Sequence, residues 1–333
     1  MTNQEYRLFD RSGFDAIKLM KTSLIPKPSR SEIQIKFHAC SLNYRDLILS
    51  KGLYQASIKF RVVPISDGAG EVTAVGEDVT NFQIETTGAC LGSDLDGCVR
   101  QYGVFKATSC VKIPPSLSYE EAATLPCAAL TAWNALFGLS ERQLKSGQTV
   151  LVQGTGGVSM FGAQFALATG AKVILISSSD NKIAAATKHL DTKNLMTINY
   201  NTTPQWGKKV KELTGGRGVN HILEIGGEKT LKQSLEALAY GGVINVIGFL
   251  SIIGTGPSVS GLEVIMGTLG KNACIRGIAI GSVQQFNAMN DAIEMHKIKP
   301  IIDKIFEFED LKSAYEYQWS QKHIGKIVVK IPQ

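Results

Sequence analysis

A glycine-rich segment, Gly154-Thr155-Gly156-Gly157, has the clearest potential for chemistry in this 333-residue sequence. The apolar run VLVQ precedes it, and the helix-favouring run MFGAQFALATG follows shortly after. Glycine lets the backbone approach a phosphate closely, and a following helix would direct its first N–H groups at that phosphate. The segment therefore predicts a dinucleotide-binding loop, with Ser159 as the small residue in the third position of the usual glycine pattern. The alternative is a tight strand-to-helix turn without a ligand.

Three serines end the next apolar run, AKVILISSS, and bear on which dinucleotide would bind. NAD enzymes usually place an Asp or Glu at this strand end for the ribose hydroxyls, and that carboxylate would repel a 2′-phosphate. The triplet Ser177-Ser178-Ser179 and Lys182 would accept the phosphate, so we expect NADP(H). Asp180 keeps NAD(H) open, because a shift of two residues would bring it to the ribose. Lys182 also fits an exposed helix lysine.

Six cysteines, at positions 40, 90, 98, 110, 127 and 274, raise the question of a metal or disulfide framework. None of them forms a CxxC pair, the close spacing that a structural zinc site uses for tetrahedral ligation. We therefore expect free and mostly buried thiols in a reducing compartment.

Charge and hydropathy argue against two further classes of protein. The net charge of +6 comes from scattered Lys and Arg, and the densest patch, Lys208, Lys209 and Lys211 beside Glu212, is typical of a solvated helix face. We therefore expect no nucleic-acid binding. No run approaches about 20 apolar residues, and the N-terminus lacks the layout of a signal peptide, so we expect a cytoplasmic protein without membrane contact.

The elements that must position the glycine loop change in character near residue 120. Before it, EIQIKFH (32–38) alternates polar and apolar residues like a half-buried strand, and GAGEVTAVG (68–76) is a strand bounded by glycines. After it, Ser118 can cap a helix, and five apolar strands then alternate with helices. This alternation predicts an α/β protein with a parallel sheet. A helix near 283–296 and a closing strand, GKIVVKI, complete the chain.

Eight motifs spread over nearly the whole chain carry a family resemblance. They are SLNYRD (41–46), KGLY (51–54), PISDGAGEVTAVGEDV (64–79), EEAATLPCAALTAWNAL (120–136), VLVQGTGGVS (150–159), GGRGVNHILEIGG (215–227), GGVINVIG (241–248) and HIGKIVV (323–329). Through them the sequence resembles the zinc-free branch of the medium-chain dehydrogenase/reductase family, the quinone oxidoreductase-like proteins, which are also described as zinc-type alcohol dehydrogenase-like.

The resemblance implies a GroES-like β-rich domain built from both chain ends, with a doubly wound Rossmann sheet inserted between them. We expect the GroES-like substrate domain over residues 1–122 and the Rossmann NADP(H)-binding domain over 123–280. Residues 281–333 would then return to the first domain.

The zinc-dependent and zinc-free branches of this family differ mainly in their metal ligands. The zinc-dependent relatives use a Cys near the first motif, a His in a Gly-His-Glu motif and a later Cys. Here SLNYRD has no matching Cys, Ser66-Asp67-Gly68 has no His, and only Cys127 matches the third position. One thiolate cannot close a catalytic site that needs three protein ligands. We therefore expect no metal, with Cys127 as a small apolar filler, although Asp67 could contact one.

Without zinc, the charge that develops on a substrate oxygen must be stabilised by hydrogen-bond donors. By resemblance, Asn43, Tyr44, Asp46 and Tyr54 border the nicotinamide pocket as catalytic residues. Tyr54 matches a tyrosine that enoyl-thioester reductases of this superfamily use as a donor. The alternative for Tyr44 and Tyr54 is aromatic packing at the pocket wall, and the alternative for Asn43 is a helix cap.

The resemblance also implies cofactor contacts beyond the glycine loop, on several strand ends and near the C-terminus. Together with the loop and the serines, the expected cofactor-binding set is Thr131, Gly154, Thr155, Gly156, Gly157, Val158, Ser177, Ser178, Ser179, Lys182, Tyr200, Gly226, Gly227, Gly248, Phe249, Leu250 and Lys326.

One stretch departs from the family pattern. After Phe82 the relatives continue with Gly-Asp-x-Val and a long loop that roofs the substrate pocket, whereas this chain runs QIETTGACLGSDLDG. The length of this loop, and with it the size of the pocket, is left open.

The function expected from all of this is NADPH-dependent hydride transfer to a conjugated carbonyl, a quinone or a related small molecule, without zinc. Two alternatives stay open: zinc-dependent alcohol oxidation, and a dinucleotide-binding protein that is not an enzyme. We also expect a homodimer through the strand CIRGIAI (274–280), because an apolar sheet edge left exposed would invite aggregation and the relatives pair this edge across a two-fold axis.

Overall fold

The computed structural model describes residues 3–22, 24–54, 57–80, 91–248 and 259–333. The chain forms two compact units: the first combines Met1–Leu130 with Ser282–Gln333, and the second is Thr131–Gly281. The first unit thus continues to Leu130, beyond the predicted change of domain after residue 122. The C-terminal segment belongs to the first unit from Ser282 onward, one residue after its predicted start.

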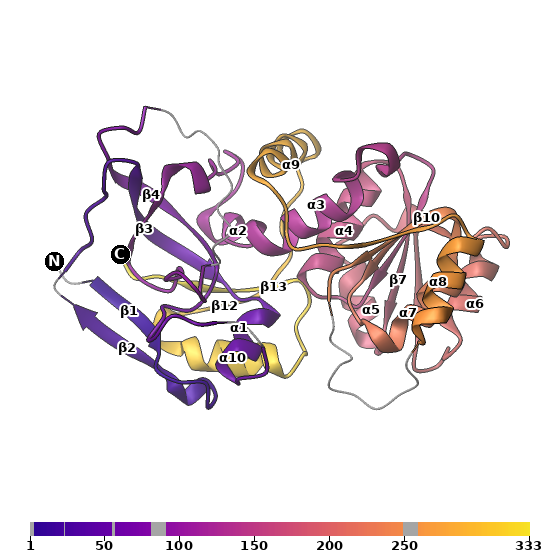
Figure 1. Ribbon diagram of the computed structural model, residues 1–333, viewed down its shortest axis with the longest axis horizontal. Coiled ribbons are helices and arrows are strands. Elements are labelled where there is room, and N and C mark those ends of the chain that lie inside the picture. Colours follow the sequence, from indigo (N-terminus) through magenta and orange to yellow (C-terminus); the bar gives the residue numbers. More distant parts are fainter. Residues whose placement is uncertain (1–2, 23, 55–56, 81–90, 249–258) are drawn as a thin grey trace. The chain divides into compact units, whose positions relative to one another are not determined.

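Strands dominate the first unit (Figure 1). They are β1 (Asn3–Leu8), β2 (Ile17–Thr22), β3 (Glu32–Ser41), β4 (Asp67–Val75), β5 (Tyr102–Lys106), β12 (Ile302–Phe306) and β13 (Lys326–Lys330). Five of them form a sheet in the order β12-β13-β3-β4, with β5 pairing to β3 as well, and β1 pairs with β2. The two strands predicted before residue 120 correspond to β3 and β4. The last strand of the chain, β13, lies inside the sheet beside β3, so both chain ends build this unit.

Short helices complete the first unit. They are α1 (Tyr44–Ser50), α2 (Tyr119–Ala122), α9 (Val283–His296) and α10 (Leu311–Trp319), with 3-10 turns at Phe14–Ala16, Ala107–Ser109 and Phe308–Asp310 and a π-helical turn at Leu125–Ala129. Ser118 caps α2, as predicted: its hydroxyl accepts the N–H of Glu121, whose carboxylate in turn accepts the N–H of Ser118. Pro126 lies in the π-helical turn.

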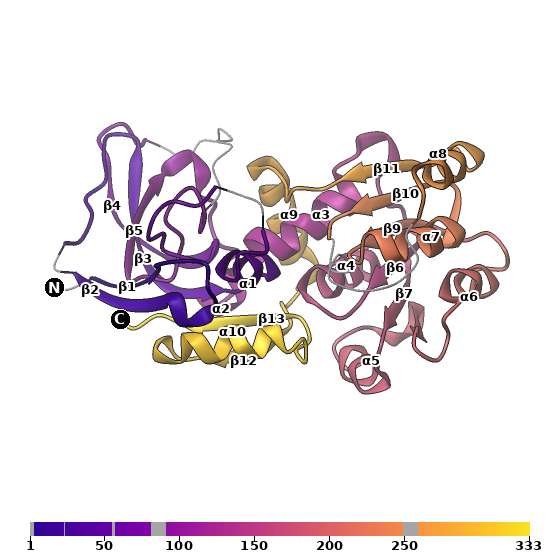
Figure 2. The same ribbon diagram turned by 60° about the horizontal axis from the view of Figure 1, so that its bottom comes forward.

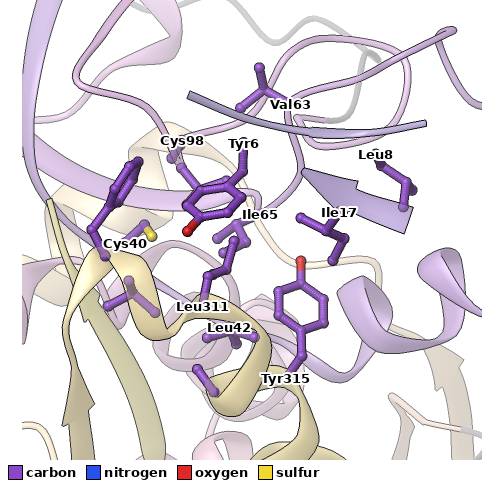
Figure 3. Close-up of a cluster of buried hydrophobic side chains, with 14 of the residues drawn as sticks. Tyr6, Leu8, Ile17, Cys40, Leu42, Val63, Ile65, Cys98, Leu311 and Tyr315 are labelled. Carbon is purple, nitrogen blue, oxygen red and sulfur yellow. The ribbon is translucent and has the colours of Figure 1, made fainter. Parts of the chain in front are cut away.

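The core of the first unit gathers side chains from segments far apart in the chain (Figure 3). Tyr6 of β1 and Ile17 of β2 lie in the same cluster as Leu311 and Tyr315 of α10. Tyr315 is fully buried, and its ring centroid lies 5.3 Å from that of Phe14. Aromatic rings supply much of the buried apolar area in such a core. The C-terminal helix is therefore an integral part of the first unit.

The second unit is a six-stranded parallel sheet with helices between its strands. The strands are β6 (Thr149–Gln153), β7 (Lys172–Ser177), β8 (Leu195–Asn199), β9 (Val219–Glu224), β10 (Leu238–Val246) and β11 (Cys274–Gly277), in the order β11-β10-β9-β6-β7-β8. Figure 2 shows β11, β10, β9, β6 and β7 side by side. The predicted Rossmann fold is confirmed, and the strand order reverses between β6 and β9. Ligands of such sheets bind at the carboxyl ends of the strands at this reversal.

The helices of the second unit are α3 (Leu130–Phe137), α4 (Gly157–Ala168), α5 (Asp180–Thr187), α6 (Trp206–Leu213), α7 (Glu228–Ala237) and α8 (Gly261–Gly270), with 3-10 turns at Ser140–Arg142 and Thr192–Asn194. Two differences from the predicted elements concern the edge of the sheet. The helix α8 was not predicted. The predicted strand 274–280 ends at Gly277, and residue Ile280 has a φ of 75°, which is incompatible with a strand.

None of the helices in the part of the chain that the structure describes combines the length and apolar character needed to cross a membrane.

Candidate active site

The glycine loop lies at the reversal of the strand order, between the end of β6 and the start of α4. Gly154 has a φ of 79°, a backbone conformation that side chains rarely adopt, and Gly156 caps α4 without any side-chain hydrogen bond. A Cβ added at either glycine would meet no atom within 4 Å. The loop therefore leaves open space above the first N–H groups of α4, which include those of Gly157 and Val158 and have no capping side chain.

Small residues bring α4 close to the sheet behind this loop. The buried hydroxyl of Ser159 donates to the carbonyl oxygen of Gln153 at 2.6 Å, which ties the first turn of α4 to the end of β6. One turn further, a Cβ on Gly162 would lie 2.4 Å from a side-chain carbon of Leu223 on β9. Larger side chains at these positions would push the helix away. Ser159 thus takes the place of the third glycine, as the sequence suggested.

A buried carboxylate, Glu224, joins the two strands that flank the reversal. The Glu224 Oε2 atom accepts hydrogen bonds from the Gln153 amide at 2.7 Å and from the Ser234 hydroxyl. The Glu224 Oε1 atom accepts the Thr230 hydroxyl and the backbone N–H groups of Gly226 at 3.0 Å and Gly227 at 2.9 Å. Five donors therefore satisfy a carboxylate that has no exposed surface.

Gln153 completes the same network from the side of β6. Its Oε1 atom accepts the backbone N–H groups of Ile225 and Gly226 at 3.0 and 3.1 Å. Gly226 and Gly227 were predicted to let the dinucleotide cross this edge of the sheet. Gln153 and Glu224 fix the backbone of that turn, and Gln153 directly precedes the glycine loop. The network thus connects the glycine loop at 154–157 to the turn at Gly226 and Gly227 through hydrogen bonds.

The end of β7 carries the residues predicted to select the cofactor. Ser177 is buried, Ser178 and Ser179 are half-buried, and Ser179 caps α5 by accepting the Lys182 N–H. The exposed carboxylate of Asp180 accepts the Asn199 amide at 2.9 Å. Tyr200 is partly exposed next to them, and its backbone N–H bonds to the Ser177 carbonyl oxygen. The end of β7 thus presents serine hydroxyl groups, while the nearby Asp180 carboxylate is hydrogen-bonded to the Asn199 amide.

Other predicted cofactor residues have varied surroundings. Thr131 is buried on α3. Gly248 follows β10, where a Cβ would lie 2.4 Å from the Ile225 carbonyl oxygen. Phe249 and Leu250 lie outside the described residues. Lys326 is in the first unit, at the start of β13. The loop, the β7 end, the turn at Gly226 and Gly248 therefore share the carboxyl edge of the sheet.

This edge fits a nicotinamide dinucleotide. The fit rests on the open space over Gly154 and Gly156, which a Cβ would fill, and on the uncapped N–H groups of α4. Such a helix start attracts a pyrophosphate through its N–H groups and its dipole.

A second polar cluster is built inside the first unit around Asn43, which precedes α1. The backbone N–H of Asn43 donates to the Asp46 carboxylate at 2.8 Å. The Asn43 Oδ1 atom accepts the Lys326 ammonium at 2.6 Å, and its Nδ2 atom lies 3.5 Å from the Ser66 hydroxyl oxygen. Asp46 and Lys326 are buried, and burial raises the pKa of Asp46 to about 6. Asn43 is the N-cap of α1, and Asp46 completes its capping box, so this contact fits the helix cap that was the alternative for Asn43.

Ser66 and Asp67 extend this cluster toward Cys127. The Ser66 hydroxyl donates to Asp67 Oδ1 at 2.6 Å, and Asp67 Oδ2 accepts the backbone N–H of Cys127 at 3.0 Å. The preceding residue, Ile65, is fully buried with a φ of 68°. Positive φ is strained for a β-branched residue and typically costs about 1–3 kcal/mol, so surrounding contacts must hold it. The backbone that presents Ser66 is therefore held under strain.

Two other predicted catalytic residues have different surroundings. Tyr44 begins α1 and stacks on Trp319 of α10, with ring centroids 6.4 Å apart and planes 3° from parallel. This contact fits the alternative of aromatic packing. Tyr54 is half-buried after α1, and its carbonyl oxygen accepts the Arg11 guanidinium.

These residues do not fit a zinc ion. Among the described residues, no three His, Cys, Asp or Glu side chains lie together as a metal site requires. The amide oxygen of Asn43 is occupied by a cation, Lys326. Burial, followed by Asp67, raises the pKa of the Cys127 thiol to about 12. The zinc positions of the relatives thus hold a hydrogen-bonded polar cluster.

Several residues of both clusters were missed as site residues at the level of sequence: Ser66, Gln153, Glu224, Thr230 and Ser234. Gln153 and Glu224 could have been found, because each is a polar residue at the end of an otherwise apolar strand and next to glycines. Ser66 had no such signal of its own.

Comparisons with known proteins agree with this fold. The family model described as "Alcohol dehydrogenase GroES-like domain" matches residues 29–115, and the one described as "Zinc-binding dehydrogenase" matches residues 157–295. The chain is 48% identical, over 96% of both chains, to a zinc-type alcohol dehydrogenase-like protein of Schizosaccharomyces pombe. It is 27% identical to the quinone oxidoreductase of Homo sapiens, over 93% of this chain and 92% of that protein.

A crystal structure from Sinorhizobium meliloti 1021, named as an alcohol dehydrogenase, has 35% sequence identity to this chain. It superposes with a TM-score of 0.86 and covers 99% of both chains. The whole length of the chain therefore shares one fold with these oxidoreductases. The chain belongs to the medium-chain dehydrogenase/reductase family, as a quinone oxidoreductase-like member.

Proposed function

We propose that this oxidoreductase uses NADPH to reduce a conjugated carbonyl, a quinone or a related small molecule, and that it does so without zinc. The observation that carries the proposal is the buried cluster around Asn43. Where the zinc-dependent relatives place metal ligands, this chain has the Ser66-Asp67 pair and the Cys127 thiol, beside the Asn43 amide whose oxygen is bonded to Lys326.

The chemistry requires a group that stabilises negative charge on the substrate oxygen. When bound, a reduced nicotinamide supplies the hydride. The Asn43 amide donates a hydrogen bond to the carbonyl oxygen; Asp46 holds the Asn43 backbone N–H, and Lys326 holds the amide oxygen. Loss of one such donor typically costs roughly 3 kcal/mol of transition-state stabilisation. The Tyr54 hydroxyl is the proposed proton donor, and Tyr44 forms part of the pocket wall.

The preference for NADPH is supported by the end of β7. A 2′-phosphate would be received by Ser177, Ser178, Ser179, Lys182 and Tyr200. The Asp180 carboxylate, which would repel that phosphate, is held by the Asn199 amide. An exposed carboxylate near this position still makes NADH the competing cofactor.

The remaining cofactor contacts are proposed along the carboxyl edge of the same sheet. The pyrophosphate binds the N–H groups of the loop and of the first turn of α4. These further contacts are Thr131, Gly154, Thr155, Gly156, Gly157, Val158, Gly226, Gly227 and Gly248, together with Phe249 and Leu250, which lie outside the described residues. Lys326, which the resemblance also implied as a cofactor contact, is assigned to Asn43 instead.

A homodimer through the edge of the second unit is also proposed. The strand β11 is the last in the sheet order, with β10 as its neighbour. Next to it in sequence, α8 exposes Leu262, Ile265, Met266 and Leu269 by 68, 63, 57 and 72% of their surfaces. The spacing i, i+3, i+4, i+7 makes these a continuous apolar stripe. A stripe of this kind marks an interaction surface, and a second copy would cover the edge and the stripe together.

The deciding experiment follows NADPH loss with the purified protein against a panel of quinones, enones, enoyl thioesters and aldehydes, together with metal analysis. We expect turnover of at least one quinone or conjugated carbonyl by protein that lacks stoichiometric zinc, and faster turnover with NADPH than with NADH. One equivalent of zinc combined with alcohol oxidation would favour the alcohol dehydrogenase alternative, in line with the names of two relatives. Tight NADPH binding without any turnover would favour a non-enzymatic role.

A further inference from the structure

Lys326 is a lysine whose side chain is buried inside the first unit. Its side chain is part of a residue that is only 4% exposed, and its ammonium donates to the Leu42 carbonyl oxygen and to Asn43 Oδ1, each at 2.6 Å. Burying an ammonium costs several kcal/mol unless its donors are satisfied. Two of its three donors are thus committed to one short segment of backbone and to one amide.

This contact fixes which way the Asn43 amide faces. An ammonium has donors and no acceptor, so the Asn43 atom at 2.6 Å from it must be the oxygen. The Asn43 NH2 group must then point in the opposite direction, where Ser66 Oγ lies 3.5 Å away. The Ser66 hydroxyl proton is committed to Asp67 at 2.6 Å, so its oxygen is available as an acceptor. An amide that could otherwise turn over is thereby held in one orientation.

We propose that Lys326 is a positioning residue, which turns the Asn43 amide so that its NH2 group faces the substrate oxygen and which polarises that amide. This inference rests on the proposed function, in which Asn43 donates to the substrate. A cation on the amide oxygen withdraws electron density from the nitrogen, so the N–H groups become stronger donors. A metal ion would polarise the substrate oxygen directly, whereas Lys326 acts through Asn43.

Two acidic side chains share this buried cluster with Lys326. The carboxylates of Asp46 and Asp67 are buried in the same cluster, and Asp46 is close enough for Lys326 to favour its ionised form. Asp46 also holds the Asn43 backbone N–H at 2.8 Å. Asn43 is therefore fixed from three sides: its N–H by Asp46, its amide oxygen by Lys326, and its amide nitrogen toward Ser66.

The substitution Asn43→Asp tests the orientation. A carboxylate keeps the shape of the side chain and an acceptor for Lys326, and it replaces the NH2 donor with a negatively charged oxygen. We expect kcat for the best panel substrate to fall about 100-fold, with the dissociation constant for NADPH changed less than about threefold. A variant with wild-type kcat would overturn the inference, because the face toward the substrate would then not be a donor.

The substitution Lys326→Met tests the positioning role, with Lys330→Met as the control. Lys330 lies on the same strand, is exposed, and is 3.9 Å from Glu120. We expect Lys326→Met to lower kcat at least tenfold while the dissociation constant for NADPH stays within threefold, and Lys330→Met to leave both unchanged. In the double variant Asn43→Asp, Lys326→Met, kcat should fall no further than in Asn43→Asp alone, because both changes remove one interaction.

Two outcomes would contradict the positioning role. If Lys326→Met weakens NADPH binding tenfold with little change in kcat, Lys326 is a cofactor contact. If the two substitutions lower kcat independently, so that their effects multiply, Lys326 does not act through Asn43.

Failure of the proposed function would look different from failure of this inference. A wild-type protein that turns over nothing in the panel would remove the reaction. The orientation can then still be read from a crystal structure of Lys326→Met, in which the Asn43 amide should turn or lose its single position. An Asn43 amide that stays unchanged would overturn the role of Lys326 independently of any activity.

Discussion

The buried polar groups around Asn43 affect one another's hydrogen bonds and charge. The Asp46 carboxylate accepts the Asn43 N–H, yet one of its oxygens has no hydrogen-bond partner within the described residues. Burial is the largest influence on this group and raises its pKa to about 6, while Arg45, the Asn43 N–H and Lys326 act in the opposite direction. Asp46 therefore changes charge within a pH range that is accessible to experiment.

The pKa of Asp46 gives a prediction for stability against pH. The folded state holds the Asp46 proton up to about pH 6, whereas the unfolded chain releases it near the ordinary aspartate pKa of 3.8. The contribution of this group to the free energy of unfolding is thus complete below about pH 4 and is lost as the pH rises through about 6. We expect wild type to lose stability relative to Asp46→Asn over that interval, as measured by urea unfolding at a series of pH values.

The matched control for this experiment is Asp291→Asn, which changes an exposed carboxyl group on α9. Its difference from wild type should stay flat with pH. A flat difference for Asp46→Asn as well would mean that the buried carboxyl keeps an ordinary pKa.

At the scale of elements, the network of Gln153 and Glu224 joins β6 to β9 below the two glycine segments. In Glu224→Gln, the new NH2 group would face the Gln153 NH2 group, whose own Oε1 atom is already bonded to Ile225 and Gly226. Two donors would then oppose each other in a dry interior, which typically costs about 1–3 kcal/mol. We expect the Gly226 turn to shift and NADPH to bind about tenfold more weakly, as measured by titration of cofactor fluorescence.

The control for the network is Glu228→Gln, on the exposed first turn of α7. It removes a carboxylate near the same turn without touching the network. If both variants bound NADPH like wild type, the network would have no part in shaping the cofactor edge.

The elements also show where prediction from sequence succeeds. All six strands of the parallel sheet were predicted, the last of them with its end three residues too late. Apolar runs such as VLVQ indicate such strands, because strands buried on both faces have few polar residues. The glycine loop was predicted from its place between a strand and a helix. The helix α8 was missed: its sequence, GLEVIMGTLG, contains three glycines, which lower helix propensity.

The contacts that could not be predicted join residues far apart in the chain. Gln153 and Glu224 are separated by 71 positions, and Asn43 and Lys326 by 283. Each contact depends on which strands become neighbours, β6 with β9 and β13 with β3, and on their register. Apolar periodicity predicts that a strand exists, but it contains no information about its partner.

At the scale of the whole molecule, the proposed dimer gives a further prediction. We expect wild type to have twice the chain mass in light scattering, and Ile265→Glu to be monomeric, because a charge in the middle of the α8 stripe would have to be buried in the dimer. Since Ile265 is 63% exposed in the single chain, the variant should fold normally.

Met295→Glu serves as the control for the dimer, because Met295 is an equally apolar and exposed residue on α9 of the first unit. It should leave the dimer intact. A monomeric wild type, or a dimer that survives Ile265→Glu, would show that the stripe has another role.

The position of β13 between β12 and β3 has a consequence for how the protein is made. The second unit consists of one uninterrupted segment, Thr131–Gly281, so it can fold as soon as that segment has left the ribosome. The sheet of the first unit must wait for residues 326–330, which are synthesised after the whole of that segment. Lys326 begins this strand. The nascent chain therefore contains the glycine loop of the second unit before it contains the ammonium that orients Asn43.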